Sequence, residues 1–316
     1  MKILLTGGAG FIGSYVLRAY LNAGHQVVVL DDLSTGRREA VPYTVPFYRA
    51  DICDRAALAE VMQQLRPDIV NHHAGVASVR SSQRNPERIL QVNVQGTANV
   101  LRAARSSGVR KFIFASSGGA VYGDAKDLPV AEGAPLAPIS AYGESKVQAE
   151  QLIMQEDGRF ESIILRYGNV YGPGQDPRRD NGVIPIFAHD LLIGKVPKIY
   201  GDGNQRRDYV YVSDVAEANL KALICGSFGV FNIGTGLGYR VDEVYQLIGR
   251  SLCISAIPDY QPHNPFEVKD VVLNVNRAET VLGWRAKVSF EEGLARTLTA
   301  IAPRARSIRK QVVSEQ

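Results

Sequence analysis

The sequence predicts an α/β protein built on a doubly wound parallel sheet, with a smaller C-terminal lobe. Apolar strand-like runs alternate regularly with helix-like stretches through the first half of the chain, as in a parallel sheet covered by helices. The first run leads directly into a glycine-rich turn, which is typical of Rossmann-type folds. The 316 residues are enough for one large lobe and a smaller one.

The chain opens with a strand that enters this glycine-rich turn. Residues 3–5 form a continuous apolar run, as expected for a strand buried on both faces. Gly7, Gly10 and Gly13 follow at three-residue spacing. Glycines there allow the backbone to approach a phosphate and the next helix to pack closely, while free N–H groups at the helix start can hold a pyrophosphate. A tight turn without a ligand is the alternative, but the position between strand and helix favours a dinucleotide site.

The second predicted strand, over residues 26–31, ends in an acid. Asp31 lies 18 residues after Gly13, close to the spacing of the acid that hydrogen-bonds the adenosine ribose in dinucleotide-binding folds. A carboxylate at this point repels a 2′-phosphate, so Asp31 favours NAD over NADP. A simple loop acid is the alternative, and Arg37 and Arg38 leave NADP open.

The next elements continue the alternation of strands and helices. They are predicted as a strand ending near residue 50, a helix over 55–65, a strand over 68–72, a long helix over 86–107 and a strand over 111–117. Residues 73–77 therefore fall at the carboxyl edge of the sheet, where such folds bind ligands. His72 and His73 are neighbours in a strand and point to opposite faces, which argues against a shared metal ion.

Composition argues against nucleic-acid binding, a membrane span and a metal site. With 36 basic and 32 acidic residues the net charge is +4, too small to imply nucleic acid, and the basic cluster over 304–310 is interpreted as a solvated tail. No apolar run reaches the length of a membrane span. Cys53, Cys225 and Cys253 are widely spaced, which indicates reduced thiols, a cytoplasmic protein and no metal site.

Tyr142 and Lys146 form the predicted chemical centre. They lie four residues apart in a helix predicted to run to about residue 154, so they share one helix face. A lysine ammonium beside a phenol favours the phenolate and is expected to lower the tyrosine pKa. Such a phenolate can take a proton from an alcohol. A surface pair is the alternative, but the glycine turn and the preceding strand that ends at Ser117 favour catalysis.

Taken together, several segments resemble the extended short-chain dehydrogenases/reductases, specifically the branch of NAD-dependent nucleotide-sugar epimerases and dehydratases. The resemblance covers nearly the whole chain, to about residue 300. The matching segments are residues 6–14, 31–36, 93–97, 116–123, 142–146, 166–173 and 201–208. Within the branch the sequence is most similar to enzymes that epimerise UDP-hexoses at carbon 4.

The resemblance implies a reaction through a transient 4-keto sugar. Tyr142 would remove the proton of the sugar 4-hydroxyl while hydride passes to NAD, and Lys146 would tune Tyr142 and bind the nicotinamide ribose. The residues implied to line the cofactor, beside the three glycines and the Tyr142–Lys146 pair, are Phe11, Ile12, Asp31, Asp32, Asp51, Ile52, Ala74, Gly75, Asn93 and Tyr167.

One departure from the family pattern lies beside the catalytic pair. Many members carry serine or threonine at Gly118, where the hydroxyl bridges substrate and tyrosine. Ser117 or a water could make this contact, or Ser117 could cap backbone groups instead. Dehydratases and decarboxylating relatives carry an acid just before the Val121-Tyr122-Gly123 segment, whereas this chain has none. The segment therefore favours plain epimerisation, since elimination of water needs a further acid and base.

The second half is expected to hold the nucleotide sugar. We place the NAD-binding domain at residues 1–167, with 208–234 returning to it, and the sugar-nucleotide lobe at 168–207 and 235–316. By resemblance the substrate contacts are Asn169, Gly182, Val183 and Arg207, where a guanidinium suits a phosphate. A second departure is Asn264, where relatives usually carry a phosphate-binding arginine, with Phe266 in place of their glycine.

These patterns lead to NAD-dependent 4-epimerisation of a UDP-glucose or UDP-galactose type sugar, with N-acetyl forms included. A UDP-glucuronate 4-epimerase or another NAD-dependent nucleotide-sugar dehydrogenase or dehydratase stays open. A non-catalytic NAD-sensing module is the alternative of a different class. The resemblance also implies a homodimer formed through the helices over 86–107 and 142–154.

Overall fold

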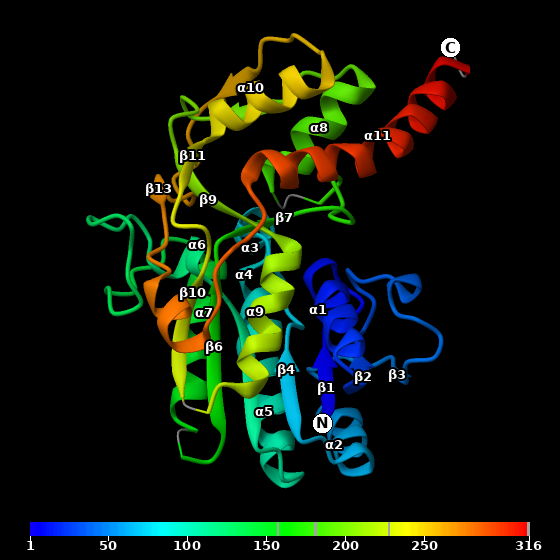
Figure 1. Cartoon of the computed structure of the whole chain (residues 1–316), viewed down its shortest axis with the longest axis vertical. Coiled ribbons are helices and arrows are strands. Elements are labelled where there is room, and N and C mark those ends of the chain that lie inside the picture. The colour runs from blue at the N-terminus through cyan, green and yellow to red at the C-terminus, as the bar shows by residue number, and fades with distance from the viewer. Residues whose placement is uncertain (157, 180–181, 227, 315–316) are drawn as a thin grey trace.

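A seven-stranded parallel sheet forms the larger part of the molecule (Figure 1), seen in a computed structural model that describes residues 1–156, 158–179, 182–226 and 228–314. The strand order is β10-β6-β5-β4-β1-β2-β3. In chain order these strands are β1 (Lys2–Thr6), β2 (Gln26–Leu30), β3 (Phe47–Tyr48), β4 (Ile69–His72), β5 (Lys111–Ser117), β6 (Glu161–Tyr167) and β10 (Gly229–Ile233). The order reverses between β1 and β4, which confirms the predicted doubly wound sheet and places a ligand crevice at their carboxyl ends.

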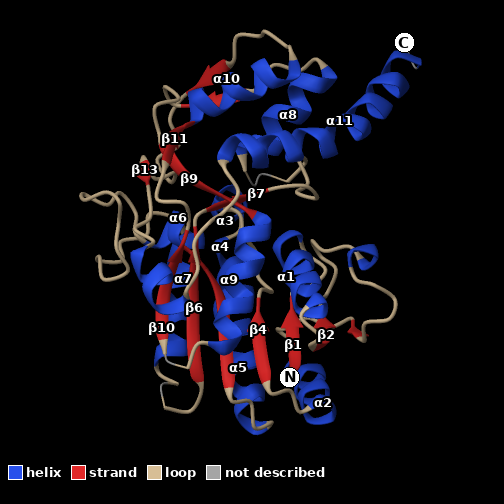
Figure 2. Cartoon of the chain, in the orientation of Figure 1, coloured by secondary structure: helices blue, strands red, loops and turns tan. Residues whose placement is uncertain are grey.

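Helices cover both faces of this sheet (Figure 2). One face packs against α1 (Phe11–Asn22) and α9 (Val212–Ile224), and the other against α2 (Arg55–Leu65), α5 (Thr97–Ser106) and α7 (Ala141–Met154). Successive residues of β1 alternate between the two cores: Ile3 and Leu5 lie in the first, and Leu4 lies in the second. Burial on both faces is the reason for the uninterrupted apolar run of this strand.

The long helix expected over 86–107 is built from consecutive pieces. It begins with α4 (Pro86–Leu90), passes through a π-helical stretch, η2 (Gln91–Gly96), and continues as α5. Asn85 caps α4 by accepting a hydrogen bond from the Arg88 N–H at 3.0 Å. Two short helices that the sequence analysis did not identify precede these pieces and follow β5, namely α3 (Val79–Arg84) and α6 (Gly118–Val121).

The elements above the sheet in Figure 1 form a second lobe with its own core. Its strands are β7 (Asn169–Tyr171), β9 (Arg206–Tyr211), β11 (Gly238–Arg240) and β13 (Asp270–Val271) in one sheet, and β8 (Lys198–Tyr200) and β12 (Asp259–Gln261) in another. Its helices are α8 (Val183–Ile193), α10 (Val241–Leu252) and α11 (Phe290–Ser314). Two further short helical segments are η1 (Arg38–Ala40), between β2 and β3, and η3 (Ala278–Leu282), between β13 and α11. Side chains of η3 pack into the core that contains α1 and α9.

The chain passes between the two lobes several times. The strand expected to return to the large sheet after residue 208 is β9, and it pairs with β7, β11 and β13 instead. Only after β9 does the chain return, as α9 and β10. The domain boundaries proposed from the sequence therefore stay a prediction. The pairing of β9 within the second lobe favours a return to the large sheet after β9 and not at residue 208.

Helix α11 runs away from both lobes toward the C-terminus (Figure 1). Its first half is anchored by the buried side chains of Phe290, Leu294, Leu298 and Ile301, which belong to the core of the second lobe. Within the described residues, no helix combines the length and apolar character needed to cross a membrane.

Candidate active site

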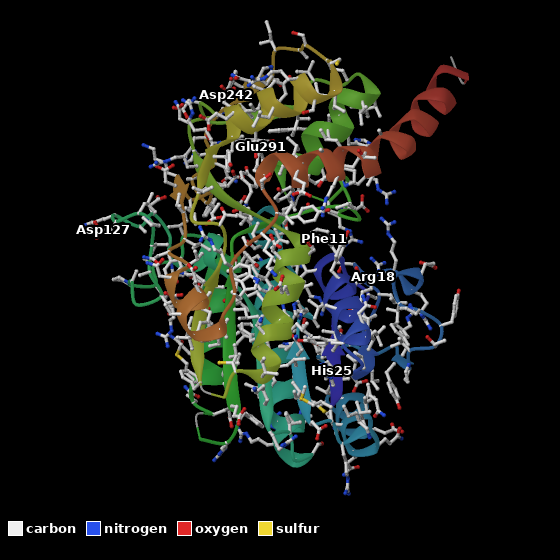
Figure 3. All side chains as sticks on the ribbon, viewed as in Figure 1. Phe11, Arg18, His25, Asp127, Asp242 and Glu291 are labelled. Carbon is white, nitrogen blue, oxygen red and sulfur yellow. The ribbon has the colours of Figure 1, made fainter. Side chains whose placement is uncertain are left out.

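A cleft of about 1110 Å³ runs between the carboxyl edge of the seven-stranded sheet and the second lobe. In Figure 3 the labelled Phe11 lies at the end of α1 that faces the second lobe, and Arg18 lies further along the same helix. The predicted site residues that line this cleft are Gly7, Gly10, Phe11, Ile12, Gly13, Asp31, Asp32, Asp51, Ile52, Ala74, Gly75, Ser117, Tyr142, Lys146, Tyr167, Asn169, Gly182, Val183 and Arg207. Residues from distant parts of the sequence thus meet along one surface.

The glycine turn is shaped by close backbone contacts. Gly7 has a φ of +71°, and a Cβ there would lie 2.6 Å from the backbone nitrogen of Ala74. A Cβ at Gly13 would collide with the carbonyl oxygen of Gly7. Side chains at these two positions would therefore push the turn away from β4 or α1. A Cβ at Gly10 would meet only the Gly7 oxygen, at 3.2 Å, and this position forms part of the cleft surface.

Asp31 joins the end of β2 to the glycine turn. Its carboxylate accepts hydrogen bonds from the backbone N–H groups of Ala9, at 3.0 Å, and Leu33, at 2.9 Å. Burial raises the pKa of this carboxyl group, and the two backbone hydrogen bonds act in the opposite direction. Because Asp31 lines the cleft, the remaining lone pairs can accept hydroxyl hydrogens. The glycine cradle and this acid fit an unphosphorylated adenosine ribose.

Arg37 bears on the choice between NAD and NADP. Its guanidinium forms an ion pair of 3.4 Å with Asp176, in the loop that follows β7. Its charge is thereby balanced by a carboxylate of the second lobe. This pairing weakens the case for a 2′-phosphate at the adenosine end of the cleft. Asp32, the other acid at this end, accepts hydrogen bonds from the backbone and hydroxyl of Ser34.

Two other predicted cofactor residues, Asp51 and Ile52, follow β3 and form one wall of the cleft. Asp51 accepts a hydrogen bond from the backbone of Cys53 at 2.8 Å and lies 3.5 Å from Arg88. Ile52 packs against Gly96, where a Cβ would lie 2.6 Å from its Cδ1 atom. The tight fit of Gly96 to Ile52 holds this wall against η2.

Asn93 was predicted to contact the cofactor, but its side chain binds neighbouring protein groups. Among the described residues it is the predicted cofactor contact that does not line the cleft. Its amide accepts from the Val76 N–H at 2.8 Å and donates to the Val76 carbonyl and to Ser145 Oγ. A Cβ at Gly75 would lie 2.9 Å from Asn93 Oδ1. Asn93 therefore lies behind the wall and fixes the segment that follows β4.

The Tyr142–Lys146 pair projects from the first turns of α7, opposite the end of β5. Ser140 caps this helix by accepting a hydrogen bond from the Gly143 N–H at 3.1 Å. Lys146 Nζ donates to the carbonyl oxygen of Ala115 at 2.8 Å and lies 4.7 Å above the ring of Phe114. Burial lowers the Lys146 pKa to about 8, although its ammonium is still held by a carbonyl and a ring face.

The pKa of Tyr142 moves in the direction opposite to the one expected from a lysine neighbour. Burial raises it above its usual value of 10, and a hydrogen bond with Ser117 lowers it by a smaller amount. The buried phenol therefore keeps its proton in the protein alone. Burial of the phenol outweighs the lysine effect predicted from sequence spacing, and the Lys146 ammonium is directed to the Ala115 carbonyl oxygen.

Gly118 faces the protein interior rather than the cleft. A Cβ there would lie 2.8 Å and 2.9 Å from the two terminal methyl groups of Leu273 and 3.2 Å from the Arg166 carbonyl. A Cβ at Gly119 would instead lie 3.4 Å from Asn169 Oδ1 and 3.8 Å from Ser117 Oγ. The hydroxyl next to Tyr142 is therefore that of Ser117, and Leu273 occupies the space that a larger residue at 118 would need.

The second lobe supplies the other end of the cleft. Arg207 Nη1 donates to the carbonyl oxygens of Arg206 and Lys269, both at 2.9 Å, and burial lowers the pKa of its guanidinium. Gly182, with a φ of +90°, precedes the first residue of α8, Val183. A helix start and a guanidinium are both groups of the kind that bind anions.

Asn264 stabilises its own loop rather than adding charge to the cleft. Its side chain donates to Glu267 at 3.2 Å and accepts from the Phe266 N–H and from Gln83 Nε2, each at 3.2 Å. The Gln83 contact connects α3 of the larger lobe to this loop. Phe266 and Glu267 line the cleft here, so the segment that departs from the family pattern contributes an aromatic ring and a carboxyl group to this end of the cleft.

The two adjacent histidines bind protein groups on opposite sides of the sheet. His72 contacts the hydroxyls of Thr6, at 2.7 Å, and Thr97, at 3.0 Å, whereas His73 contacts the Tyr167 hydroxyl at 3.1 Å. In the part of the chain that the structure describes, no group of three or more potential side-chain ligands is arranged to hold a metal ion.

Sequence reasoning missed the loop over 172–179 as part of the cofactor end. Tyr15 OH donates to the Pro173 carbonyl oxygen at 3.0 Å, and Arg37 pairs with Asp176 in the same loop. Tyr15 lies one helical turn after Phe11, and this spacing was the available signal. The partner on the loop has no local signature, because it is more than 150 residues away in sequence.

A dinucleotide cradle beside a Tyr–Lys pair, at the switch point of a doubly wound sheet, defines the extended short-chain dehydrogenase/reductase class. The model of the NAD dependent epimerase/dehydratase family matches residues 3–234. The chain belongs to this family.

Several relatives are similar over almost their full lengths. A UDP-glucose 4-epimerase of Mycolicibacterium smegmatis is 38% identical over 306 residues, covering 94% of this chain and 97% of the relative. A Thermotoga maritima UDP-glucose 4-epimerase solved with UDP-glucose superposes with a TM-score of 0.94 at 40% identity, covering 96% and 99% of the two chains. A Thermus thermophilus UDP-glucose 4-epimerase solved with NAD has a TM-score of 0.90 at 40% identity, covering 95% and 99%.

Proposed function

We propose that this protein is an NAD-dependent 4-epimerase of UDP-hexoses, acting on UDP-glucose and UDP-galactose. The observation that carries the proposal is that one cleft is lined by the glycine cradle, the Tyr142–Lys146 pair and Arg207. This combination fits a cofactor and a sugar nucleotide that meet at the Tyr142–Lys146 pair. The glycine cradle would hold the cofactor diphosphate, and Arg207 would hold the diphosphate of the sugar nucleotide.

Tyr142 is the acid–base group at the sugar. Its phenol gives and takes the proton of the 4-hydroxyl, and Ser117 stabilises the charged form by a hydrogen bond, which favours proton transfer. Bound NAD supplies a reversible hydride acceptor and a positive charge that favours the Tyr142 phenolate. Lys146, as an ammonium, adds to this positive field. Since the cofactor ends each cycle unchanged, no external oxidant is required.

Arg207 and the start of α8 hold the nucleotide diphosphate. The planar guanidinium can bind two phosphate oxygens at once, and the Arg206 and Lys269 carbonyls orient it. The first turn of α8, beginning at Val183, offers free N–H groups to the same anion. Asn169, whose side chain lies close to Gly119, orients the sugar between these groups and Tyr142.

Elimination of water is the alternative reaction that the site disfavours. A 4,6-dehydratase needs a second acid and base near carbons 5 and 6 of the sugar. Residues 118–120 are Gly-Gly-Ala and carry neither. Oxidation and re-reduction at carbon 4 requires Tyr142 alone as proton carrier, so epimerisation is the reaction that the residues support best.

The test is incubation of the purified protein with UDP-galactose in the absence of added NAD, followed by chromatographic analysis of the nucleotide sugars. We expect UDP-glucose to form. A parallel screen over UDP-N-acetylglucosamine and UDP-glucuronate determines which sugar substituents the site accepts. Failure of well-folded, NAD-containing protein to interconvert any of these UDP-sugars would refute the epimerase proposal and favour an NAD-sensing role.

Two broader features belong to the same proposal. We infer a homodimer through the α4–α5 and α7 helices, by resemblance to the family, and a cytoplasmic location, which the wide spacing of Cys53, Cys225 and Cys253 in the sequence supports. Light scattering of the purified protein tests the dimer, and a mass of about one chain would exclude it.

A further inference from the structure

Three consecutive residues at the end of β5 are joined to three successive turns of α7. The Ala115 carbonyl accepts from Lys146 Nζ at 2.8 Å, Ser116 Oγ donates to Glu150, and the Ser117 side chain bonds Tyr142. The partners on α7 are spaced by four residues, so they lie along one face of the helix. Two of these three contacts involve the proposed catalytic pair, and the third involves Glu150.

Glu150 is fixed from a second strand by an ion pair. Arg166 of β6 approaches it with Nη2 at 2.6 Å from Oε2 and Nε at 3.0 Å from Oε1, and the two side chains are 2% and 0% exposed. Arg166 Nη1 also donates to Tyr122 OH at 2.8 Å, and that hydroxyl donates to Asn232 at 2.7 Å. The carboxylate is thus tied to β5 through Ser116 and to β6 through Arg166.

Stability alone does not explain the buried Glu150–Arg166 ion pair. Removing two charges from water is unfavourable, and an apolar pair of similar volume is often as stable as a buried ion pair. Within the described chain, neither Glu150 nor Arg166 lines the cleft, so neither can touch a ligand there. The position of Glu150 on α7, one turn beyond Lys146, points to a role that acts through the catalytic pair.

We propose that Glu150, held by Arg166, is a positioning residue that fixes the Tyr142–Lys146 face of α7 against β5 and places a carboxylate one helical turn from Lys146. The catalytic meaning of this role rests on the epimerase function proposed above. The contacts themselves join only α7, β5 and β6. Their role can therefore be tested whether or not the protein turns over a UDP-sugar.

The charged and titratable groups around Lys146 support the direction of this effect. Burial lowers the Lys146 pKa to about 8, and the Glu150 carboxylate acts against this decrease. His72 at the end of β4 and His73 just after it stay neutral, because burial lowers the pKa of each to about 3. Tyr142 is an uncharged phenol in the protein alone, and the Arg166 guanidinium, though positive, is bound to both Glu150 oxygens. Loss of the carboxylate would leave Lys146 easier to deprotonate.

The test replaces Glu150 by glutamine, which keeps the shape and removes the charge. In the Glu150→Gln holoenzyme we expect kcat to fall on the order of 10-fold to 100-fold, as for a displaced catalytic group. The alkaline limb of its pH profile should move to lower pH by about one unit, since an opposite charge is lost. The KM for the UDP-sugar and the NAD content should be unchanged, because Glu150 lies outside the cleft.

Glu156→Gln is the matched control. Glu156 is another buried glutamate, just after α7, and it pairs with Arg105 and Arg159. Its replacement should lower the melting temperature but leave kcat and the pH profile unchanged. If Glu150→Gln loses only stability, as this control does, the positioning role is wrong.

Two further measurements cover poor folding and lack of turnover. Ser116→Ala removes one link to β5 while leaving the ion pair intact, and it should lower kcat with little movement of the alkaline limb. Carbon NMR of the lysine side chains, with Lys146 assigned from Lys146→Arg, reports its pKa in the NAD-bound protein without substrate. A Lys146 pKa that is the same in the wild type and Glu150→Gln would overturn the proposal even if the epimerase function failed.

Discussion

Tyr142 is the residue on which the proposed chemistry depends most directly. Replacing it by phenylalanine keeps the ring in place against Ser117 and removes the proton carrier. We expect kcat to fall by about 100-fold to 10,000-fold, the usual range for loss of a general acid–base group. NAD should stay bound at the wild-type level, measured as nucleotide released on denaturation. Full activity in this variant would show that another group carries the proton.

Lys146 gives the reaction a predicted pH dependence. Its pKa is lowered by burial from 10.5 to about 8, so the ammonium is lost as the pH rises through that value. Activity that needs the positive charge should therefore decrease above about pH 8, unlike the behaviour of an exposed lysine. The measurement is kcat against pH at saturating UDP-galactose. A profile that stays flat up to pH 10 would contradict the role assigned to this ammonium.

Gly118 shows why a family serine cannot simply be restored. The Leu273 methyl groups lie 2.8 Å and 2.9 Å from the position of a Cβ, so Gly118→Ser must displace them. We expect a loss of about 1–3 kcal/mol in the free energy of unfolding, typical of overpacking, with no gain in kcat. Denaturant titration measures the loss. The double variant Gly118→Ser/Leu273→Ala should tolerate the serine better; equal penalties with and without Leu273 would disprove the explanation.

At the scale of elements, the loop over 172–179 acts as a strap across the cofactor end of the cleft. It is tied to the larger lobe by Tyr15 at Pro173 and by Arg37 at Asp176. Neighbouring arginines lower the pKa of Asp176 to about 2. Since this pKa is lowered, the contribution of the ion pair is present above the unfolded pKa of about 4 and is lost only as the pH falls through about 2.

This strap should slow the release of NAD. Arg37→Ala removes a link between the lobes, and a partly exposed pair of this kind contributes up to about 1 kcal/mol. The rate of NAD release should accordingly rise about 2-fold to 5-fold, measured by transfer of bound NAD to a trapping dehydrogenase. Arg178→Ala is the control, because Arg178 pairs with the same carboxylate from within the loop. Equal rates of NAD release in the two variants would show that the Arg37–Asp176 link does not slow release.

Long elements were predictable from sequence, whereas short ones were not. The helix expected from Tyr142 to about residue 154 is α7, and the helix expected over 55–65 is α2 with the same limits. In contrast, β8, β11, β12 and β13 contain two or three residues each, too few to show an alternating pattern. Their pairing depends on chain segments far away in the sequence, so local residue preferences carry no information about it.

The same division applies to the candidate site as a whole. The cofactor end was predictable because the glycine turn and Asp31 lie in one short unit of strand, turn, helix and strand. The environment of the catalytic pair was not, since the Lys146 contact with Ala115 and the Glu150 contact with Arg166 join separate elements. The reversal of the expected Tyr142 pKa shift has the same origin, because burial depends on the whole fold.

The assembly of the larger lobe from distant segments leads to a prediction for the isolated fragment 1–167. That fragment lacks α9 and β10, which complete the first core of the seven-stranded sheet. Side chains such as Phe231 and Val215 would be missing from a core in which they are completely buried. We expect the fragment to show no cooperative thermal unfolding by circular dichroism. A cooperative transition like that of the full chain would support residues 1–167 as a domain in its own right.

The repeated crossing of the chain between the lobes also determines which parts of the molecule a bound ligand stabilises. The chain leaves the large sheet after β6, returns after β9 and leaves again after β10, so neither lobe can come apart without pulling on segments of the other. A ligand that binds only the folded state stabilises whatever unfolds together with its site. We therefore expect NAD held at one end of the cleft to raise the melting temperature of the opposite lobe as well, and to slow proteolytic cleavage in parts of the chain that the cofactor never touches.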